Sequence, residues 1–156
     1  YTIKSLGNKE IGVINLQGRI NMMAIDDPFK RVDAALREIR KRTPYVFVDF
    51  HAESTEEKEA MGFYLDGRVT AVVGTHTHVQ TADEKILPEG TAYITDLGLT
   101  GVLHQVIGSR PDRAIERQLT QLPMKSEIAE GKASLQGVII ESDPKGKAVS
   151  IERFTY

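Results

Sequence analysis

Apolar residues alternate with polar ones near both ends of the chain, a period that is typical of half-exposed β-strands. Residues 1–6 and 11–16 are β-prone runs on either side of a Gly-Asn pair, which favours a tight turn because both residues tolerate positive φ. Residues 134–141 and 147–154 repeat the pattern around an Asp-Pro-Lys-Gly turn. The sequence therefore predicts a β-hairpin at each end.

The middle of the chain alternates between short apolar runs and helical spacing. The apolar runs at residues 45–50, 69–74 and 91–95 predict buried strands. The first of them follows a predicted helix that an Asp-Asp-Pro start opens, with a carboxylate for the N-cap and proline in the first turn. Apolar residues at helical spacing give this helix one buried face: Phe29, Val32, Leu36 and Ile39.

Two more helices are expected. Ser54 and Glu57 resemble a capping box that opens a helix through about residue 61. Residues 111–119 form the other, with Ile115 and Leu119 on one face. Strands alternating with helices, and hairpins at both ends, favour one layered α/β domain over residues 1–156, with a mixed sheet.

The composition restricts the possible binding partners and metal ligands more than it restricts the fold. The chain has 20 Lys and Arg against 22 Asp and Glu, or −2 overall, so its net field does not favour nucleic acid or an anionic membrane. The basic cluster at residues 37–42 is interpreted as a solvated helix end. Without cysteine, a metal must be bound by imidazole, carboxylate or amide groups, which suit iron, manganese or zinc. The lack of cysteine also fits a cytoplasmic protein.

Histidines follow two of the predicted buried strands. His51 comes after residues 45–50, and His76 and His78 come after residues 69–74. In open α/β sheets, ligands bind beyond the carboxyl ends of the strands. Residues two apart in extended chain project to the same side, so His76 and His78 can reach one group of ions. A structural role is the alternative for each histidine taken alone, but the three together predict a metal site.

Four carboxylates near the histidines could fix the rings from a second shell: Asp49, Glu53, Asp83 and Asp96. For Asp96 the alternative is a cap on the turn that follows it.

Two further residues have both a functional and a structural interpretation. Arg68 could bind a substrate phosphate as a bidentate donor, but the Asp-Gly turn before it favours a solvated charge. His104 could protonate a leaving group. We expect an exposed loop histidine instead, and its replacement by glutamine should leave metal binding unchanged.

Several longer stretches resemble one family of enzymes. Among them are VDFHAE at residues 48–53, VVGTHTHVQTAD at 72–83, LPEGTAYITDLGLTG at 87–101 and SLQGVIIE at 134–141. They are similar to the YmdB-type calcineurin-like metallophosphoesterases over nearly the whole chain. The resemblance implies a four-layer α/β/β/α sandwich with mixed sheets.

The resemblance also implies a function and a set of ligands. Such enzymes are metal-dependent phosphodiesterases or phosphatases of small phosphodiesters, such as 2′,3′-cyclic nucleotides, and use a metal-bound water. By position, His51 and His76 match ligands of one metal ion, and His78 matches a ligand of a second. The two ions would be iron or manganese, with zinc as another option.

The family's remaining ligands and its leaving-group histidine belong to an N-terminal half that these 156 residues lack. The chain is therefore interpreted as a single C-terminal portion of the metallophosphoesterase domain, inactive by itself. The small phosphodiester is the expected partner; no nucleic-acid or membrane partner is indicated, and homo-oligomers remain open.

Two alternatives stay open at this point. A His-x-His pair also marks other binuclear metallohydrolases, including metallo-β-lactamase-like enzymes and amidohydrolases. The former expect Asp and His soon after the pair, where Val79-Gln80-Thr81 stands here, and the latter need a barrel of ~250 residues. The second alternative is a non-catalytic scaffold or partner-binding fragment.

Overall fold

The computed structural model describes residues 1–156, and its largest element is a six-stranded mixed sheet in the order β1-β2-β3-β4-β6-β5. Strands β2, β3, β4 and β6 are parallel, and the edge strands β1 and β5 run antiparallel to their neighbours. The bounds are β1 Thr2–Leu6, β2 Lys9–Gln17, β3 Val46–His51, β4 Ala71–Thr75, β5 Lys85–Ile86 and β6 Ala92–Ile94. The predicted mixed sheet is confirmed, and so is the first hairpin, β1–β2.

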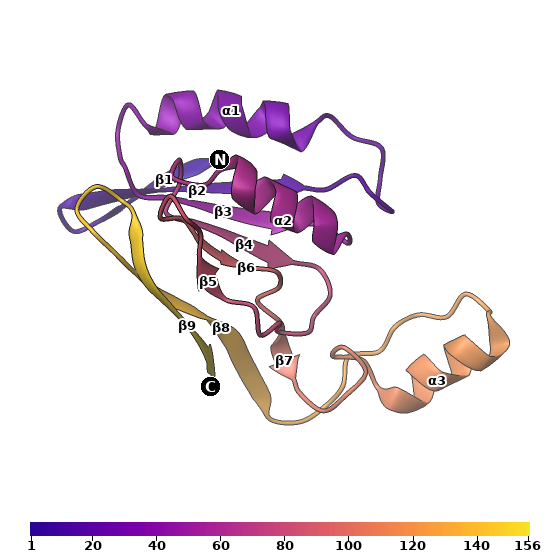
Figure 1. Cartoon of the computed structure of the whole chain (residues 1–156). Helices are drawn as coiled ribbons and strands as arrows, with labels where there is room; N and C mark the ends of the chain where they lie inside the picture. The colour runs from indigo at the N-terminus through magenta and orange to yellow at the C-terminus, as the bar shows by residue number, and fades with distance from the viewer.

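Two helices cover one face of this sheet, α1 (Pro28–Ile39) and α2 (Thr55–Tyr64) (Figure 1). Asp27 caps α1, since its carboxylate accepts from the backbone nitrogen of Phe29 at 2.9 Å. The predicted apolar face of α1 packs onto the central strands in one cluster of buried residues, including Val32, Leu36, Ile39, Val48 and Phe50. Burial of this stripe, more than helix propensity, holds α1 in place.

The expected capping box at α2 is only half formed. Ser54 Oγ accepts from the backbone nitrogen of Glu57 at 3.2 Å, as expected. The Glu57 carboxylate, however, accepts from the backbone nitrogens of Arg19 and Ile20 in the loop after β2. Glu57 is buried. It therefore ties the β2–α1 loop to α2 instead of closing the box.

A second sheet, in the order β7-β8-β9, packs on the other face of the first sheet. Its strands are β7 Thr100–Val102, β8 Ala133–Ser142 and β9 Ala148–Thr155, so the second predicted hairpin is also confirmed. Small side chains let the two sheets approach: Ala71, Ala92 and Ala148 are buried together. Figure 1 shows the resulting layers, with the helices, the six-stranded sheet and the β8–β9 hairpin in succession.

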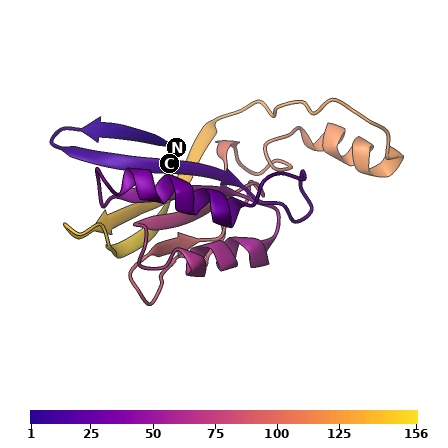
Figure 2. The ribbon, with the colours of Figure 1, turned by 90° about the horizontal axis from the view of Figure 1, so that it is seen from above.

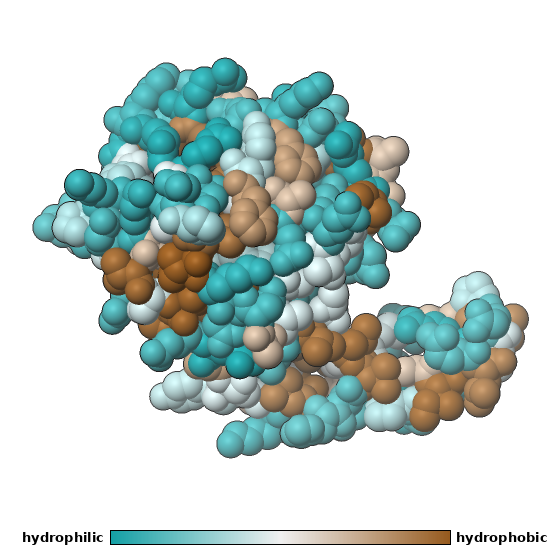
Figure 3. Space-filling view, in the orientation of Figure 1, coloured by the Kyte–Doolittle hydropathy of each residue, from teal (hydrophilic) through white to brown (hydrophobic).

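The third predicted helix is confirmed as α3 (Pro111–Thr120), but its apolar face does not pack against either sheet. It projects away from both sheets (Figure 1, Figure 2). Ile115 and Leu119 are 55% and 80% exposed, and Ala114 is its one buried residue. Apolar residues therefore lie on the surface of the projecting segment at residues 111–122, which we call the arm (Figure 3). None of the helices is both long and apolar enough to span a membrane.

Candidate metal centre

The parallel strands bring the predicted site residues to one edge of the six-stranded sheet. His51 is the last residue of β3 and pairs in register with Thr75, the last residue of β4. His76 follows directly, and Asp96 lies two residues beyond the end of β6, which neighbours β4. The carboxyl ends of three neighbouring strands thus form the candidate site, as expected for an open α/β sheet.

His51 and His76 lie side by side at this edge. His51 Nε2 is 3.0 Å from His76 Nδ1, and the two rings meet edge to face with centroids 4.8 Å apart. The other nitrogen of His76, Nε2, lies 2.9 Å from Glu53 Oε2. Both rings are partly exposed, so the space in front of them is open to solvent.

A chain of hydrogen bonds fixes the tautomer of His51. The Thr75 hydroxyl donates its one hydrogen to Asp49 Oδ1 at 2.8 Å, and Asp49 Oδ2 accepts from the Asn15 amide at 2.6 Å. Thr75 Oγ1 is therefore the acceptor for His51 Nδ1, 3.1 Å away. A neutral imidazole carries one proton, so His51 holds it on Nδ1 and presents Nε2 as a bare lone pair.

The same reasoning assigns the proton of His76. A carboxylate accepts and does not donate, so neutral His76 carries its proton on Nε2, facing Glu53. Its Nδ1 is then bare, and it faces the bare Nε2 of His51 across 3.0 Å. Two lone pairs repel at that distance. In these tautomers the two nitrogens are close enough to bind one metal ion together.

His78 also has one ring nitrogen that donates and one that is bare, but it lies apart from His51 and His76. Its Nδ1 is 3.1 Å from the carbonyl oxygen of Ile107, which can only accept, so neutral His78 is protonated on Nδ1 and its Nε2 is free. The ring is exposed. A ring nitrogen that donates to a backbone carbonyl while the other is bare is the usual state of a metal-binding histidine.

The backbone of the His76-Thr77-His78 turn is strained. His76 has a φ of 123° and His78 a φ of 62°, in the region that favours glycine. Each such residue costs ~1–3 kcal/mol and persists only where its surroundings enforce it. Strain of this kind gathers at functional sites.

Asp96 holds this turn in place. Its Oδ2 accepts from the backbone nitrogen of Thr77 at 2.9 Å and from Lys58 Nζ at 3.0 Å, while Oδ1 accepts from the backbone nitrogen of Gly98 at 2.9 Å. The side chains of Asp96 and Lys58 are 0% and 1% exposed. Asp96 therefore caps its own turn, and it also fixes the backbone of the turn that carries two histidines; it makes no hydrogen bond to either ring.

Gly74 allows β4 and the end of β6 to come close enough for this contact. A Cβ on Gly74 would overlap the carbonyl oxygen of Thr95. The backbone nitrogen of Leu97 donates to the carbonyl oxygen of Gly74 at 2.9 Å, directly beside that point. Any larger residue at position 74 would push Asp96 away from Thr77.

These groups fit part of a metal centre. No set of three or more His, Asp or Glu side chains in the structure could hold one ion. The pair His51–His76 nevertheless offers two bare nitrogens, and ligands bound ~2.1 Å from one ion at right angles are ~3 Å apart. The donor chemistry therefore suits an ion that takes further ligands from elsewhere, with His78 contributing separately.

The sequence profile of YmdB-like proteins matches residues 1–154. The chain belongs to the YmdB-like family. It is 54% identical over 153 residues to the 2′,3′-cyclic-nucleotide 2′-phosphodiesterase of Bacillus subtilis, a match that covers 97% of this chain and 58% of that protein. This YmdB-like chain thus spans less than two thirds of that relative.

Two solved structures share the fold of this YmdB-like chain. A hypothetical protein from Thermus thermophilus superposes with a TM-score of 0.92 at 39% identity, covering 99% of this chain and 60% of the other. A phosphatase from Mycoplasma pneumoniae gives a TM-score of 0.87 at 33% identity, over 99% and 56% of the two chains. The mixed α/β fold is therefore that of a known phosphatase structure.

Arg68 is not brought to the histidines. It precedes β4, whereas His76 follows the same strand, so the length of β4 separates them. Its guanidinium pairs with Asp33 of α1 and also donates to the carbonyl oxygen of Tyr64. The structural interpretation of Arg68 agrees with these contacts, and the structure gives no support to a phosphate-binding role.

Asp83 also lies away from the rings. It accepts from the backbone nitrogen and hydroxyl of Thr95, at 3.2 and 2.5 Å. Burial alone would raise the pKa of Asp83, but hydrogen bonds from Thr81 and Thr95 hold the pKa below its ordinary value of 3.8. Asp83 stabilises the end of β6. Of the three other carboxylates, Glu53 contacts His76, Asp49 is linked to His51 through Thr75, and Asp96 binds the backbone of Thr77.

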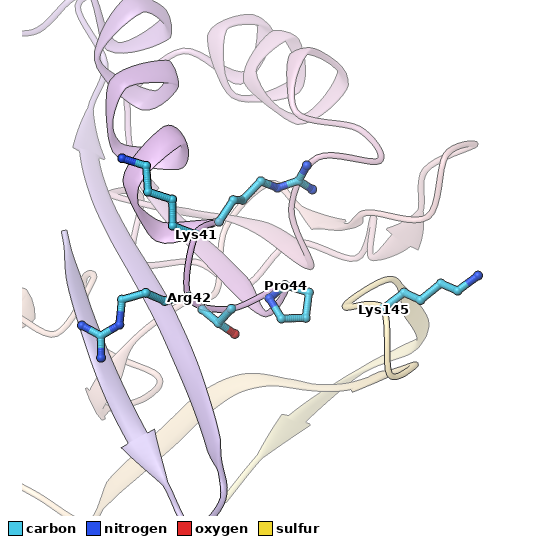
Figure 4. A pocket seen from close by; sticks show the side chains of 6 residues that line it. Lys41, Arg42, Pro44 and Lys145 are labelled. Carbon is cyan, nitrogen blue, oxygen red and sulfur yellow. The ribbon is translucent and has the colours of Figure 1, made fainter.

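The basic cluster at the end of α1 does not form an anion site. It lines a concavity with Pro44 and Lys145, but the side chains of Lys41, Arg42 and Lys145 point away from one another (Figure 4). Lys41 pairs with Glu38, and Arg42 pairs with Glu10. The interpretation as a solvated helix end agrees with this arrangement.

Sequence reasoning missed two residues that shape the site, Thr75 and Lys58. Thr75 could have been found from the sequence, because it follows the predicted strand at residues 69–74 directly and therefore lies beside His51, with a hydroxyl that can reach Asp49. No pattern in the sequence indicates the role of Lys58, since its partner Asp96 lies 38 residues away.

Proposed function

We propose that this chain carries the histidine side of the metal centre of a phosphodiesterase that acts on small phosphodiesters, such as 2′,3′-cyclic nucleotides. The observation that supports the proposal most strongly is the 3.0 Å approach of two ring nitrogens, His51 Nε2 and His76 Nδ1. The 54% identity to a 2′,3′-cyclic-nucleotide 2′-phosphodiesterase points to the same chemistry. The metals would be iron or manganese, which imidazole and carboxylate ligands suit.

Each residue has a distinct task in this proposal. His51 and His76 would hold one ion, and His78 would hold a second. Two such ions, when bound, would supply charge to bind a phosphate and to activate a water. The role of the chain itself is to orient three imidazoles, through Thr75 and Asp49 for His51, Glu53 for His76, and Ile107 for His78.

We further propose that the remaining ligands come from polypeptide outside these 156 residues, and that this chain is the C-terminal portion of one metallophosphoesterase domain. No three ligands for one ion meet within the chain, and the chain spans 58% of the Bacillus relative. The residues alone would then be inactive. A fourth, helical layer would complete the sandwich over the second sheet, where Leu135 and Ile139 are 46% and 61% exposed.

Hydrolysis of 2′,3′-cyclic AMP by the intact protein tests this function. We expect activity that is lost with a chelator and restored by Mn²⁺ or Fe²⁺. His78→Ala should lower kcat/KM at least ~100-fold, because removing a ligand should exceed the ~10–100-fold effect of removing a supporting residue. Gln118→Ala, on the exposed face of α3, is the control that should change nothing. Turnover that survives both the chelator and His78→Ala would exclude the proposal.

A further inference from the structure

His78 forms one wall of a pocket of about 280 Å³, to which the proposed function has so far given no role. The pocket lies between the turn after β4, the loop from β7 toward α3, and β8. Its walls are apolar at Leu99, Val102 and Ile107, and its polar lining includes three glutamines and His104. His104, set aside from the sequence as an exposed loop residue, is thus in the same pocket as a candidate ligand.

Two glutamines of this pocket are fixed by the fold. Gln136 Oε1 accepts from the backbone nitrogen of Leu99 at 3.0 Å, and Gln80 Nε2 donates to the carbonyl oxygen of Gly137 at 2.9 Å. Gly98 makes room for both, with a φ of 91°, since a Cβ there would overlap Gln136 Oε1 and lie 2.9 Å from Gln80 Cβ. The pocket is therefore built by specific contacts and is not a gap between mobile side chains.

The fixed glutamines leave one amide nitrogen and one amide oxygen without a partner in the chain. Gln136 Nε2 and Gln80 Oε1 bond to no other group of the chain, while the opposite atoms of both amides are used. Gln105 makes no hydrogen bond within the chain and also lines the pocket. Amide edges beside apolar walls suit a flat ring that is apolar on its faces and carries donors and acceptors at its rim.

The size of the pocket agrees with one ring system. Pockets for whole drug-sized ligands have volumes of ~300–1,000 Å³, so about 280 Å³ is near the lower limit. A nucleoside phosphate would fill it with the base and keep the phosphate outside. The exposed ring of His78 lines the pocket, with Nε2 free.

We propose that this pocket binds the heteroaromatic base of the nucleotide while the phosphate lies at the histidines, an inference that rests on the proposed function. His104 and Gln105 would then be specificity-determining residues of the substrate side. Neither makes a hydrogen bond within the chain, so both are free to contact a base. The pocket, and not the metal centre, would distinguish nucleotides from other phosphate esters.

Equilibrium dialysis of the intact protein against adenosine 3′-monophosphate and ribose 3-phosphate tests this proposal, because the two probes differ by the base. The wild type should bind the nucleotide more tightly. Gln105→Ala should weaken nucleotide binding about fivefold, the loss expected for one hydrogen bond, without changing the affinity for ribose 3-phosphate. Leu103→Trp, which fills the pocket, should abolish the preference. Gln118→Ala and Leu122→Trp, both on the arm, are the matched controls.

The outcomes distinguish a failure of the base-binding proposal from a failure of the proposed function. Equal binding of the two probes, binding of neither, or a preference that survives Leu103→Trp would overturn the base-binding role. A preference that survives Gln105→Ala but is lost in Leu103→Trp supports the pocket and assigns the contact to another residue. If the preference holds while the wild type does not hydrolyse 2′,3′-cyclic AMP, the proposed function fails and the base site stands.

Discussion

Asp96 Oδ2 lies 2.9 Å from the backbone nitrogen of Thr77, so a buried carboxylate holds the one residue that separates His76 from His78. The same oxygen accepts from Lys58 Nζ, which is itself buried. In the proposed metal site, this buried ion pair would be the support behind the turn that carries two of the ligands. Its removal should affect both stability and metal binding.

Asp96→Asn should lower the free energy of unfolding by ~3–5 kcal/mol, because it leaves the Lys58 ammonium buried without its counter-charge. Urea unfolding measures the change. The double variant Lys58→Met/Asp96→Asn should recover most of the loss, since no lone charge remains. An Asn variant as stable as the wild type would show that Lys58 and Asp96 do not form this pair.

Thr75→Val should weaken metal binding ~10–100-fold, because Val cannot accept from His51 Nδ1 and the tautomer of the ring is no longer fixed. Competition with a coloured chelator gives the affinity in the intact protein. Thr75→Ser keeps the hydroxyl and should bind metal like the wild type. If Val and Ser behave alike, the chain of hydrogen bonds through Asp49 has no part in preparing His51.

Asp83→Asn should reduce the dependence of stability on pH in the acid range. The folded-state pKa of Asp83 is lowered from 3.8, so the ionised carboxylate stabilises the fold above that pH, and this contribution is lost as the pH falls through the folded-state pKa. Unfolding free energies at pH 7 and below pH 4 should differ less in the variant than in the wild type. Glu56→Gln, at an exposed position, is the control and should keep the wild-type difference.

The positions of the histidines could be predicted because they depend on local signals. A short apolar run predicts a buried strand, parallel strands share an edge, and His51 and His76 stand at the ends of two such runs. The boundaries moved by one residue or two, so that His51 ends its strand instead of following it. Such a shift leaves the side chain at the same edge.

The supporting contacts could not be predicted, because they join segments far apart in the chain. Glu57 accepts from Arg19, 38 residues away, although its spacing from Ser54 favours a capping box. Helix α3 forms as its periodicity indicates, but no sequence pattern shows that Leu119 would stay exposed. Strand β5 has two residues and takes its conformation from pairing with β6, not from its own composition.

His104 is an exposed loop histidine, as the sequence predicts, but its neighbours could not be predicted. From the sequence it lies 26 positions beyond His78, in a stretch with no regular pattern. The loop after β7 folds back so that both histidines line one pocket, and the carbonyl oxygen of Ile107 from that loop accepts from His78 Nδ1. Only the tertiary structure makes His104 a candidate for substrate recognition.

The metal content of the intact protein tests the central claim, that His51, His76 and His78 bind metal. Elemental analysis should find two ions per chain in the wild type, as in other two-metal phosphoesterase centres. The double variant His51→Ala/His76→Ala should lose one ion or both, and His104→Gln should match the wild type. Two ions retained in the double variant, with the fold intact, would contradict the assignment of these histidines.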